Sequence, residues 1–238
     1  MSPETVYRWI YCRDMRERQL WKKLRRHHVK RWRRHQRRSR GMRIPPERRI
    51  ARRPQDIAAR RIAGHWEADL VMFRAALNGQ RNVMTLVERT TRFVRLARLE
   101  DRASRGVARA MQALTAHLPA PLRQSVTCDQ GSEFVTFTAT EKTTGMTVWF
   151  CDPRSPWQKG SVENMNGRLR QFLPMDTLLP SIGPSALRAI EARMNATPRK
   201  CLGYLTPAEA MDRLIESVSP GGAAPPYGSA APPGPAFP

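Results

Sequence analysis

The segment from His65 to Phe73, HWEADLVMF, limits the possible folds more than any other part of the chain. Apolar and acidic side chains alternate along it, as they do in a β-strand whose successive side chains lie on opposite faces. One face of this strand is therefore expected to pack on a core, while the other carries two acids. The apolar face comprises Trp66, Ala68, Leu70 and Met72, and the opposite face comprises Glu67, Asp69 and Val71.

The residues after this strand predict a mixed α/β domain. Residues 82–99 indicate two further strands joined near residues 89–92, and residues 104–118 repeat apolar side chains at helical spacing. Two shorter runs, residues 124–129 and 147–151, are typical of strands. Together with a final helix, these elements favour a mixed five-stranded sheet flanked by helices.

That final helix is predicted to begin at Ser155 and to stop at Pro174. Ser155 is the expected N-cap, Pro156 the first helical position, and Gln158 the partner that completes a capping box. Apolar residues recur along the helix at spacings of three and four, which predicts a seam against the sheet. Glu163 lies on the adjoining stripe, where it could approach the strand ends that carry acids. The seam comprises Val162, Met165, Leu169 and Phe172, and the stripe also holds Asn166, Gly167 and Arg170.

The positive charge is concentrated near the N-terminus. The chain has a formal net charge of +22, and residues 1–61 hold 22 Lys and Arg against 5 Asp and Glu, whereas residues 62–238 hold 20 against 15. Such an arm suits a polyanion, because each neutralised phosphate releases counterions. Within it we expect a short helix capped by Ser2, a second, very basic helix over residues 15–38, and a linker after Pro45 and Pro46.

Several classes of function lack the residues they require. The four cysteines form no CxxC pair, no segment resembles a secretory signal or a membrane span, and a reducing cytoplasm is expected. His65 and Glu67 form the HxE of zinc deaminases, but the PCxxC partner is missing. Neither a GxxxxGK[ST] loop nor a GxSxG elbow occurs, so nucleotide hydrolysis and serine acyl transfer have no support.

Three carboxylates on separate elements suggest a metal site beside DNA. Asp69, Asp129 and Glu163 supply the oxygen ligands that Mg²⁺ or Mn²⁺ prefers, and such ions also bind phosphates. Two ions about 3.5–4 Å apart would serve an in-line displacement at phosphorus. Without metal, these acids would repel the phosphates that the basic arm attracts, so their presence favours a cation.

Five motifs strengthen this hypothesis. GHWEADLV, TLVERTTRFV, CDQGSEF, FCDPRSPWQKGSVENMNGRLRQFLP and NATPRKCLGYLTPAEAM together resemble the IS-thirty family of bacterial insertion-sequence transposases, over most of residues 2–215. The resemblance implies an RNase H-like integrase core whose acidic triad is Asp69, Asp129 and Glu163, with 33 residues between the last two. It also implies metal-dependent cleavage at the ends of a mobile element, followed by attack of the freed 3′ hydroxyl on target DNA.

The same resemblance gives expectations about the domains. Residues 1–61 are expected to form a remnant helix-turn-helix and basic arm, residues 62–215 the catalytic core, and residues 216–238 a low-complexity disordered tail. The segment SPETVYRWIY is similar to the second helix of a helix-turn-helix, so an N-terminal truncation and weak recognition of element ends are expected. The family usually has glycine in place of Ala68.

Some assignments have alternatives. Glu67 lies on the same strand face as Asp69 and could be the metal ligand or a supporting acid, Asp129 could serve only a turn, and Glu163 could be a surface acid. Trp149 and Trp157 are expected in the core.

The expected partners are double-stranded DNA, as element ends and target, and further copies of the chain on that DNA, with no membrane and no small-molecule substrate. The other functions considered are an RNase H-like nuclease without strand transfer and a non-catalytic basic DNA-binding protein. Candidate DNA contacts are Arg25, Arg26, Arg33, Arg34, Arg37, Arg38, Lys159, Asn164, Asn166 and Arg170.

Overall fold

The structure is a computed structural model that describes residues 2–15, 17–25, 27–29, 44–153 and 155–218. Contacts within the chain divide it into two units, Met1–Gly41 and Met42–Pro238. Among the described residues, no helix has both the length and the apolar character needed to cross a membrane.

The first unit begins with the predicted short helix. α1 spans Pro3–Ile10, and the Ser2 hydroxyl accepts a hydrogen bond from the Thr5 N–H at 3.2 Å, which confirms the N-cap. The prediction of a second helix over residues 15–38 is wrong where the structure describes them. Short 3₁₀ helices occupy Arg13–Met15 and Leu20–Lys23 instead, with Gln19 between them at a φ of 49°.

Like charges explain the broken helix. Arg18 and Lys22 would stand one turn apart on a continuous helix, and pairs of like charge at this spacing destabilise it. A left-handed residue such as Gln19 also interrupts the helical hydrogen bonds. The remainder of the predicted helix, residues 30–38, lies outside the described residues.

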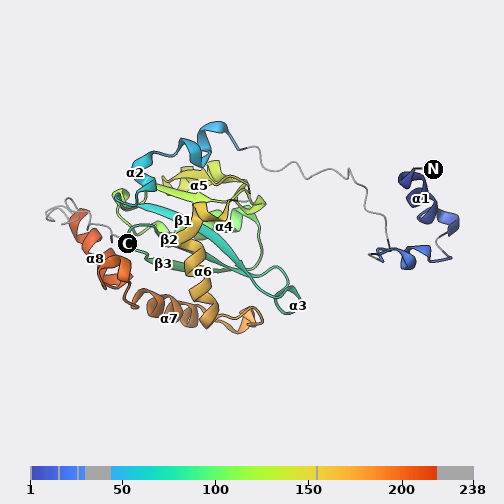
Figure 1. The fold of residues 1–238 in the computed structure, drawn as a ribbon. Helices are drawn as coiled ribbons and strands as arrows, with labels where there is room; N and C mark the ends of the chain where they lie inside the picture. Colours follow the sequence, from blue (N-terminus) through green and yellow to red (C-terminus); the bar gives the residue numbers. More distant parts are fainter. Residues whose placement is uncertain (1, 16, 26, 30–43, 154, 219–238) are drawn as a thin grey trace, which may run out of the picture. The chain divides into compact units, whose positions relative to one another are not determined.

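The second unit contains the predicted five-stranded sheet (Figure 1). Its strand order is β3-β2-β1-β4-β5; β1 pairs antiparallel with β2, and β2 with β3, whereas β4 pairs parallel with both β1 and β5. The mixed α/β fold is therefore confirmed. The strands are β1 His65–Met72, β2 Asn82–Glu88, β3 Val94–Leu99, β4 Ser125–Cys128 and β5 Thr147–Phe150.

Helices cover both faces of the sheet. α6 packs on β1 and β2 and α7 on β3, whereas α4 lies on the opposite face against β2, β3 and α5 (Figure 1). The prediction for α4, residues 104–118, is confirmed except that the helix ends at Thr115. The helices are α2 Gln55–Ala58, α3 Ala75–Asn78, α4 Ser104–Thr115, α5 Phe137–Thr144, α6 Gly160–Phe172, α7 Pro184–Asn195 and α8 Pro207–Val218.

Two apolar clusters hold these layers together. Trp66, Ala68 and Leu70 of β1 join residues of α4 and α8 in one cluster, whereas Val71 of β1 joins residues of α6 and α7 in the other. The alternation along β1 is thus confirmed. Met72 departs from it, because this last residue of the strand is 37% exposed and lies outside both clusters.

The segment expected as a linker packs against the sheet. Ile44 is buried in the larger cluster, Arg49 forms a parallel bridge with Phe150, and Arg53 donates a hydrogen bond to the Thr127 hydroxyl at 2.9 Å. The division at Gly41 therefore places residues 44–61 with the sheet rather than with the basic segment before it.

The start of α6 differs from the prediction. A 3₁₀ helix spans Pro156–Lys159, α6 begins at Gly160, and Ser155 makes no capping hydrogen bond with its side chain. Gln158 binds Asp152 instead, accepting from its N–H at 2.7 Å and donating to its carboxylate at 3.0 Å. The capping box is therefore absent, because the glutamine side chain closes the preceding turn.

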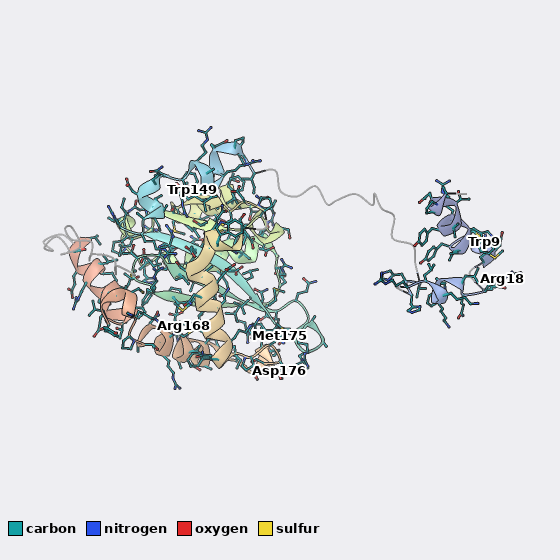
Figure 2. All side chains as sticks on the ribbon, viewed as in Figure 1. Trp9, Arg18, Trp149, Arg168, Met175 and Asp176 are labelled. Atoms are coloured by element: carbon teal, nitrogen blue, oxygen red, sulfur yellow. The ribbon has the colours of Figure 1, made fainter. Side chains whose placement is uncertain are left out.

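The rest of α6 follows the predicted pattern. Val162, Met165 and Leu169 are buried against the sheet, and the helix ends at Phe172, two residues before Pro174. Met175 and Asp176 lie in the turn that follows (Figure 2). Trp157 corrects another expectation, since it is 74% exposed.

Candidate active site

Two of the predicted acids meet where the parallel pairing of β1 with β4 ends. Asp69 belongs to β1 and Asp129 directly follows β4. The Lys159 ammonium lies between them, with Nζ 3.2 Å from Asp69 Oδ1 and 3.2 Å from Asp129 Oδ2. The two carboxylates therefore converge on one cation position, which the chain fills with its own lysine.

Both carboxylates are also fixed by the surrounding polypeptide. Asp69 Oδ2 accepts a hydrogen bond from Asn166 Nδ2 at 2.9 Å, and its Oδ1 accepts from the Leu70 N–H at 3.0 Å. Asp129 Oδ1 accepts from the Gly131 N–H at 2.9 Å, which is the turn considered from the sequence. The turn uses one oxygen of Asp129 and leaves the other directed to Lys159.

Burial shapes the electrostatics of this cluster. It raises the pKa of Asp69, and the nearby Asp129 adds to the rise, whereas the Lys159 ammonium acts in the opposite direction. Burial lowers the pKa of Lys159, but the two carboxylates outweigh it, so that this pKa lies above its ordinary value. A protonated lysine is thus held where charge repulsion between the acids would otherwise be strongest.

Glu163 lies on the same helix as the group that touches Asp69. Asn166 follows it by three residues on α6, so the two side chains are neighbours on one helix surface. Glu163 itself is exposed and makes no hydrogen bond or ion pair with other described residues. Within the described part of the chain, no three acidic, histidine or cysteine side chains form a ready metal cluster. The structure brings Asp69 and Asp129 together, whereas the Glu163 side chain contacts neither of them by a hydrogen bond or an ion pair.

Glu67 has a different environment from Asp69. Its side chain is fully buried under the start of α6, where Oε2 accepts hydrogen bonds from the Ser161 and Val162 N–H groups at 2.9 Å each. Oε1 pairs with Arg89 Nε at 3.0 Å. The negative charge therefore stabilises the positive end of the helix dipole, and Glu67 anchors α6 to β1.

Comparisons with known proteins identify the type of domain that holds these acids. Residues 59–156 match the model of the integrase core domain, a range that includes Asp69 and Asp129 and ends before Glu163. Transposase InsI for insertion sequence element IS30A of Escherichia coli (strain K12) is 37% identical over 222 residues, which cover 90% of this chain and 56% of that protein.

Two further transposases are similar to most of this chain and are matched over about two thirds of their own length. The transposase for insertion sequence element IS1086 of Cupriavidus metallidurans is 37% identical over 217 residues, covering 90% of this chain and 63% of that protein. The transposase for insertion sequence element IS4351 of Bacteroides fragilis is 30% identical over 220 residues, covering 92% of this chain and 66% of that protein. The chain belongs to the IS-thirty family of insertion-sequence transposases. It spans between about half and two thirds of the length of these relatives.

The donor set of this transposase-family chain fits a divalent cation. Asp69 and Asp129 already hold an ammonium at hydrogen-bond distance from both, and carboxylate oxygens are the ligands that Mg²⁺ and Mn²⁺ prefer. Asn166 fixes the Asp69 carboxylate, since its Oδ1 accepts a hydrogen bond from the Thr85 hydroxyl at 2.7 Å while its Nδ2 donates one to Asp69. Lys159 is the cation that both carboxylates hold in this structure.

The candidate DNA contacts of the core occupy varied environments. Lys159 and Asn166 bind Asp69, whereas Asn164 is exposed and accepts from Arg168 Nε at 3.2 Å. Arg170 donates to the backbone carbonyls of Met72 and Leu173 and stacks on Phe73. Of the arm candidates, Arg25 is exposed, and the others, Arg26, Arg33, Arg34, Arg37 and Arg38, lie outside the described residues.

The sequence interpretation missed two features of the site. It gave no role to Arg89, whose guanidinium also donates to the carbonyls of Ile57 and Ala58 and so links the segment before β1 to Glu67. It also placed Lys159 among DNA contacts rather than among the acids. Alternation along β1 gives Glu67 and Asp69 the same face, and the partners that bury Glu67 are distant in the sequence.

Proposed function

We propose that this chain carries out metal-dependent DNA cleavage and strand transfer as the catalytic part of an insertion-sequence transposase. Asp69, Asp129 and Glu163 are proposed as the catalytic acids and as the ligands of Mg²⁺ or Mn²⁺. When bound, two such ions would activate the attacking oxygen and stabilise the leaving oxygen at phosphorus. Double-stranded DNA, as element ends and as target, is the proposed substrate.

One observation carries this proposal. Asp69 and Asp129 come from different strands, yet both carboxylates reach the same Lys159 ammonium at 3.2 Å. A pair of acids that share one cation is costly without it, because each charge is partly desolvated beside the other. The membership of the chain in a family of transposases gives this cation site its proposed chemistry.

The chain's own residues have distinct proposed parts. Asn166 orients the Asp69 carboxylate, and Glu67 fixes the first turn of α6, on which Glu163 stands. Lys159 neutralises the acids when no divalent ion is bound and must leave them when one binds. Its side chain has rotatable bonds along its whole stem, so the ammonium can then turn to a phosphate oxygen of DNA.

We assign the parts of the chain accordingly. Residues 62–215 are proposed as the catalytic core, assisted by the packed segment 44–61. The basic residues before Gly41 are proposed to bind DNA phosphates without reading bases, because their charge attracts any duplex. Assembly of several copies on DNA, and residence in the bacterial cytoplasm, are parts of the same proposal.

A labelled-DNA assay tests the proposed reaction. The purified chain is incubated with a duplex carrying the terminal sequences that flank its gene, with a target plasmid, and with Mg²⁺, Mn²⁺ or EDTA. The expected result is a 3′-end nick and a joined product with either metal and neither product in EDTA. Cleavage without joining would reduce the function to that of a nuclease, and binding alone would refute catalysis.

A further inference from the structure

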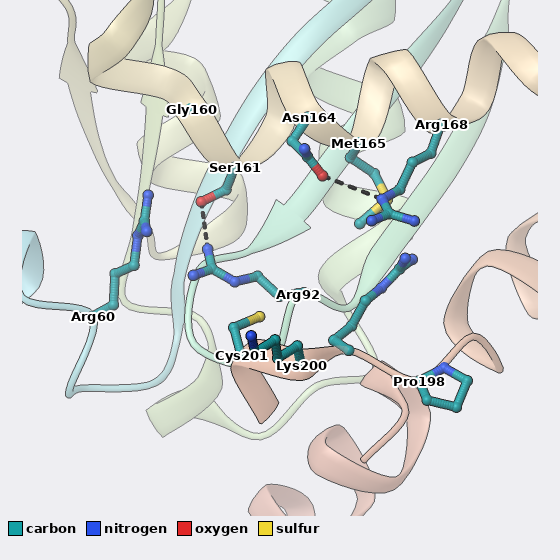
Figure 3. Close-up of a pocket in the computed structure, with 11 residues that line it drawn as sticks. Arg60, Arg92, Gly160, Ser161, Asn164, Met165, Arg168, Pro198, Lys200 and Cys201 are labelled. Carbon is teal, nitrogen blue, oxygen red and sulfur yellow. Dashed lines mark hydrogen bonds between the residues drawn. The ribbon is translucent and has the colours of Figure 1, made fainter. Parts of the chain in front are cut away.

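A basic pocket lies beside α6, separate from the Asp69 and Asp129 carboxylates (Figure 3). Its volume is about 410 Å³, and its walls come from four segments: the residues after α2, the β2–β3 turn, α6, and the turn after α7. It contains no acid among its lining residues. The cationic side chains that line it are Arg60, Arg92, Arg168, Arg199 and Lys200.

These cations have few anionic neighbours. Among the described residues, none of the five forms an ion pair with a carboxylate. Arg92 donates to the Ser161 hydroxyl at 2.7 Å, and Arg168 to the Asn164 side-chain oxygen at 3.2 Å, so both are satisfied only by neutral groups (Figure 3). The pocket therefore carries five cationic side chains with which no carboxylate of the described residues forms an ion pair.

Arg199 gives a second and independent observation. The residue is 7% exposed, and its Nε is a buried donor without a hydrogen-bond partner, although Nη2 donates to the Met194 carbonyl at 3.0 Å. Buried donors in folded proteins are nearly always paired. The Arg199 guanidinium is therefore held in the wall of the pocket by a neutral backbone carbonyl and by no carboxylate of the described residues.

The backbone supports the same interpretation. Arg60 and Arg92 both have left-handed backbones, with φ of 58° and 63°, a conformation that is unfavourable for residues with a Cβ. Burial lowers the pKa of Arg60, and Arg92 lowers it further, which shows that the two charges repel. The fold keeps them together at a cost, as binding sites for anions do.

We propose that this pocket binds a phosphodiester of the DNA strand that passes the catalytic acids. The inference rests on the proposed DNA substrate, and it assigns to that substrate a fixed contact outside the metal site. Ser161, Asn164 and Arg168 line the pocket from α6, the helix that also carries Glu163. A strand held by the pocket is therefore placed against the same rigid element that positions the third acid.

Cys201 offers a measurement inside the pocket that needs no catalysis. Its thiol is exposed and lines the pocket, whereas Cys128 and Cys151 are buried. The intact chain is treated with iodoacetamide in EDTA, with and without duplex DNA, and alkylation of each cysteine is followed by peptide mass spectrometry. We expect DNA to slow alkylation of Cys201 in a concentration-dependent manner.

Matched variants connect the protection to the pocket. Arg168→Gln and Lys200→Gln change exposed residues of the wall, whereas Arg105→Gln changes an exposed arginine of α4 on the other face of the sheet. For each variant, the DNA concentration that half-protects Cys201 is measured at several salt concentrations. In a plot of the logarithm of this concentration against log salt, the wall variants should reduce the slope by about 0.9 for each phosphate that they no longer neutralise. The Arg105 variant should leave protection of Cys201 unchanged.

The outcomes separate this inference from the proposed function. Protection of Cys201 in a chain that never cleaves DNA would support the pocket and refute only catalysis. A chain that cleaves and joins DNA while Cys201 stays as reactive as in free protein would overturn the pocket. Protection by inorganic phosphate but not by DNA, or protection that the wall variants leave intact, would also overturn it.

Discussion

Replacement of Glu67 by glutamine should destabilise the second unit strongly, although the two side chains have the same shape. The glutamate accepts from Arg89 through one oxygen and from the Ser161 and Val162 N–H groups through the other. A glutamine has one oxygen and an amide that can only donate. Its NH₂ group must therefore face a donor, and the Arg89 charge loses its only acidic partner among the described residues.

The structure sets the size of this effect. The Glu67 and Arg89 side chains are 1% and 5% exposed, and removal of one member of such a buried pair costs about 3–5 kcal/mol. One kcal/mol corresponds to about 2–4 °C in Tm for a domain of 150–250 residues, so Glu67→Gln should lower Tm by roughly 6–20 °C. The exposed pair of Arg81 and Glu100 is the matched control, and Glu100→Gln should cost at most about 1 kcal/mol.

Guanidinium unfolding of the single and double variants measures the coupling directly. Arg89→Met alone should also be costly, and the pair Glu67→Gln with Arg89→Met should be less destabilised than the sum of the two. A loss for Glu67→Gln no larger than that for Glu100→Gln would refute the anchoring role. Additive losses would refute the pairing with Arg89.

Three further predictions concern the cation, pH and salt. Lys159→Met should lower Tm in EDTA, because Asp69 and Asp129 then face each other without a cation. Mn²⁺ should raise the Tm of this variant more than that of the wild type. Equal rises in Tm would contradict the proposal that Lys159 neutralises the acids in place of a metal ion. Burial, with Arg89 and Arg53 nearby, lowers the pKa of His65 to about 4, so the unfolded chain binds this proton first and stability should fall as pH drops from about 6.5 to about 4. His65 can change the free energy of unfolding by at most about 1.4 kcal/mol per pH unit, and His65→Asn should remove this dependence on pH. If the variant kept the wild-type dependence, His65 would be excluded as the cause. Deletion of residues 13–41 should weaken binding to all duplexes alike and flatten the salt dependence by about 0.9 for each phosphate that is no longer neutralised, and an unchanged slope would place the electrostatic contacts elsewhere.

Local patterns were sufficient to predict the sheet and its two faces. Alternation along β1 identified the face that packs in the larger apolar cluster, and the turn between β2 and β3 could be located from residues 89–92. The seam of α6 also followed from spacing alone, since Val162, Met165 and Leu169 are buried as expected. These features depend on side chains within one element, which is why the sequence reveals them.

Contacts between distant segments were not predictable in the same way. Glu67 and Asp69 have the same periodicity, and only the position of the α6 N-terminus over Glu67 separates a buried anchor from a candidate metal ligand. Lys159 appears in the sequence as one more surface cation, yet it reaches Asp69 on β1 and Asp129 directly after β4. The described residues between 15 and 29 show the reverse case, because the predicted helix is absent there and helical propensity lacks a packed face to support it.

The most direct test compares three amide variants in the joining assay with Mn²⁺. Asp69→Asn, Asp129→Asn and Glu163→Gln each keep the shape of the side chain and remove one negative ligand, whereas Asp176→Asn changes an exposed acid in the turn after α6. The proposed site predicts that each of the first three abolishes cleavage and joining while DNA binding persists, and that the Asp176 variant stays active. Full joining by Glu163→Gln would contradict the account, because this exposed acid of α6 would then have no part in the reaction.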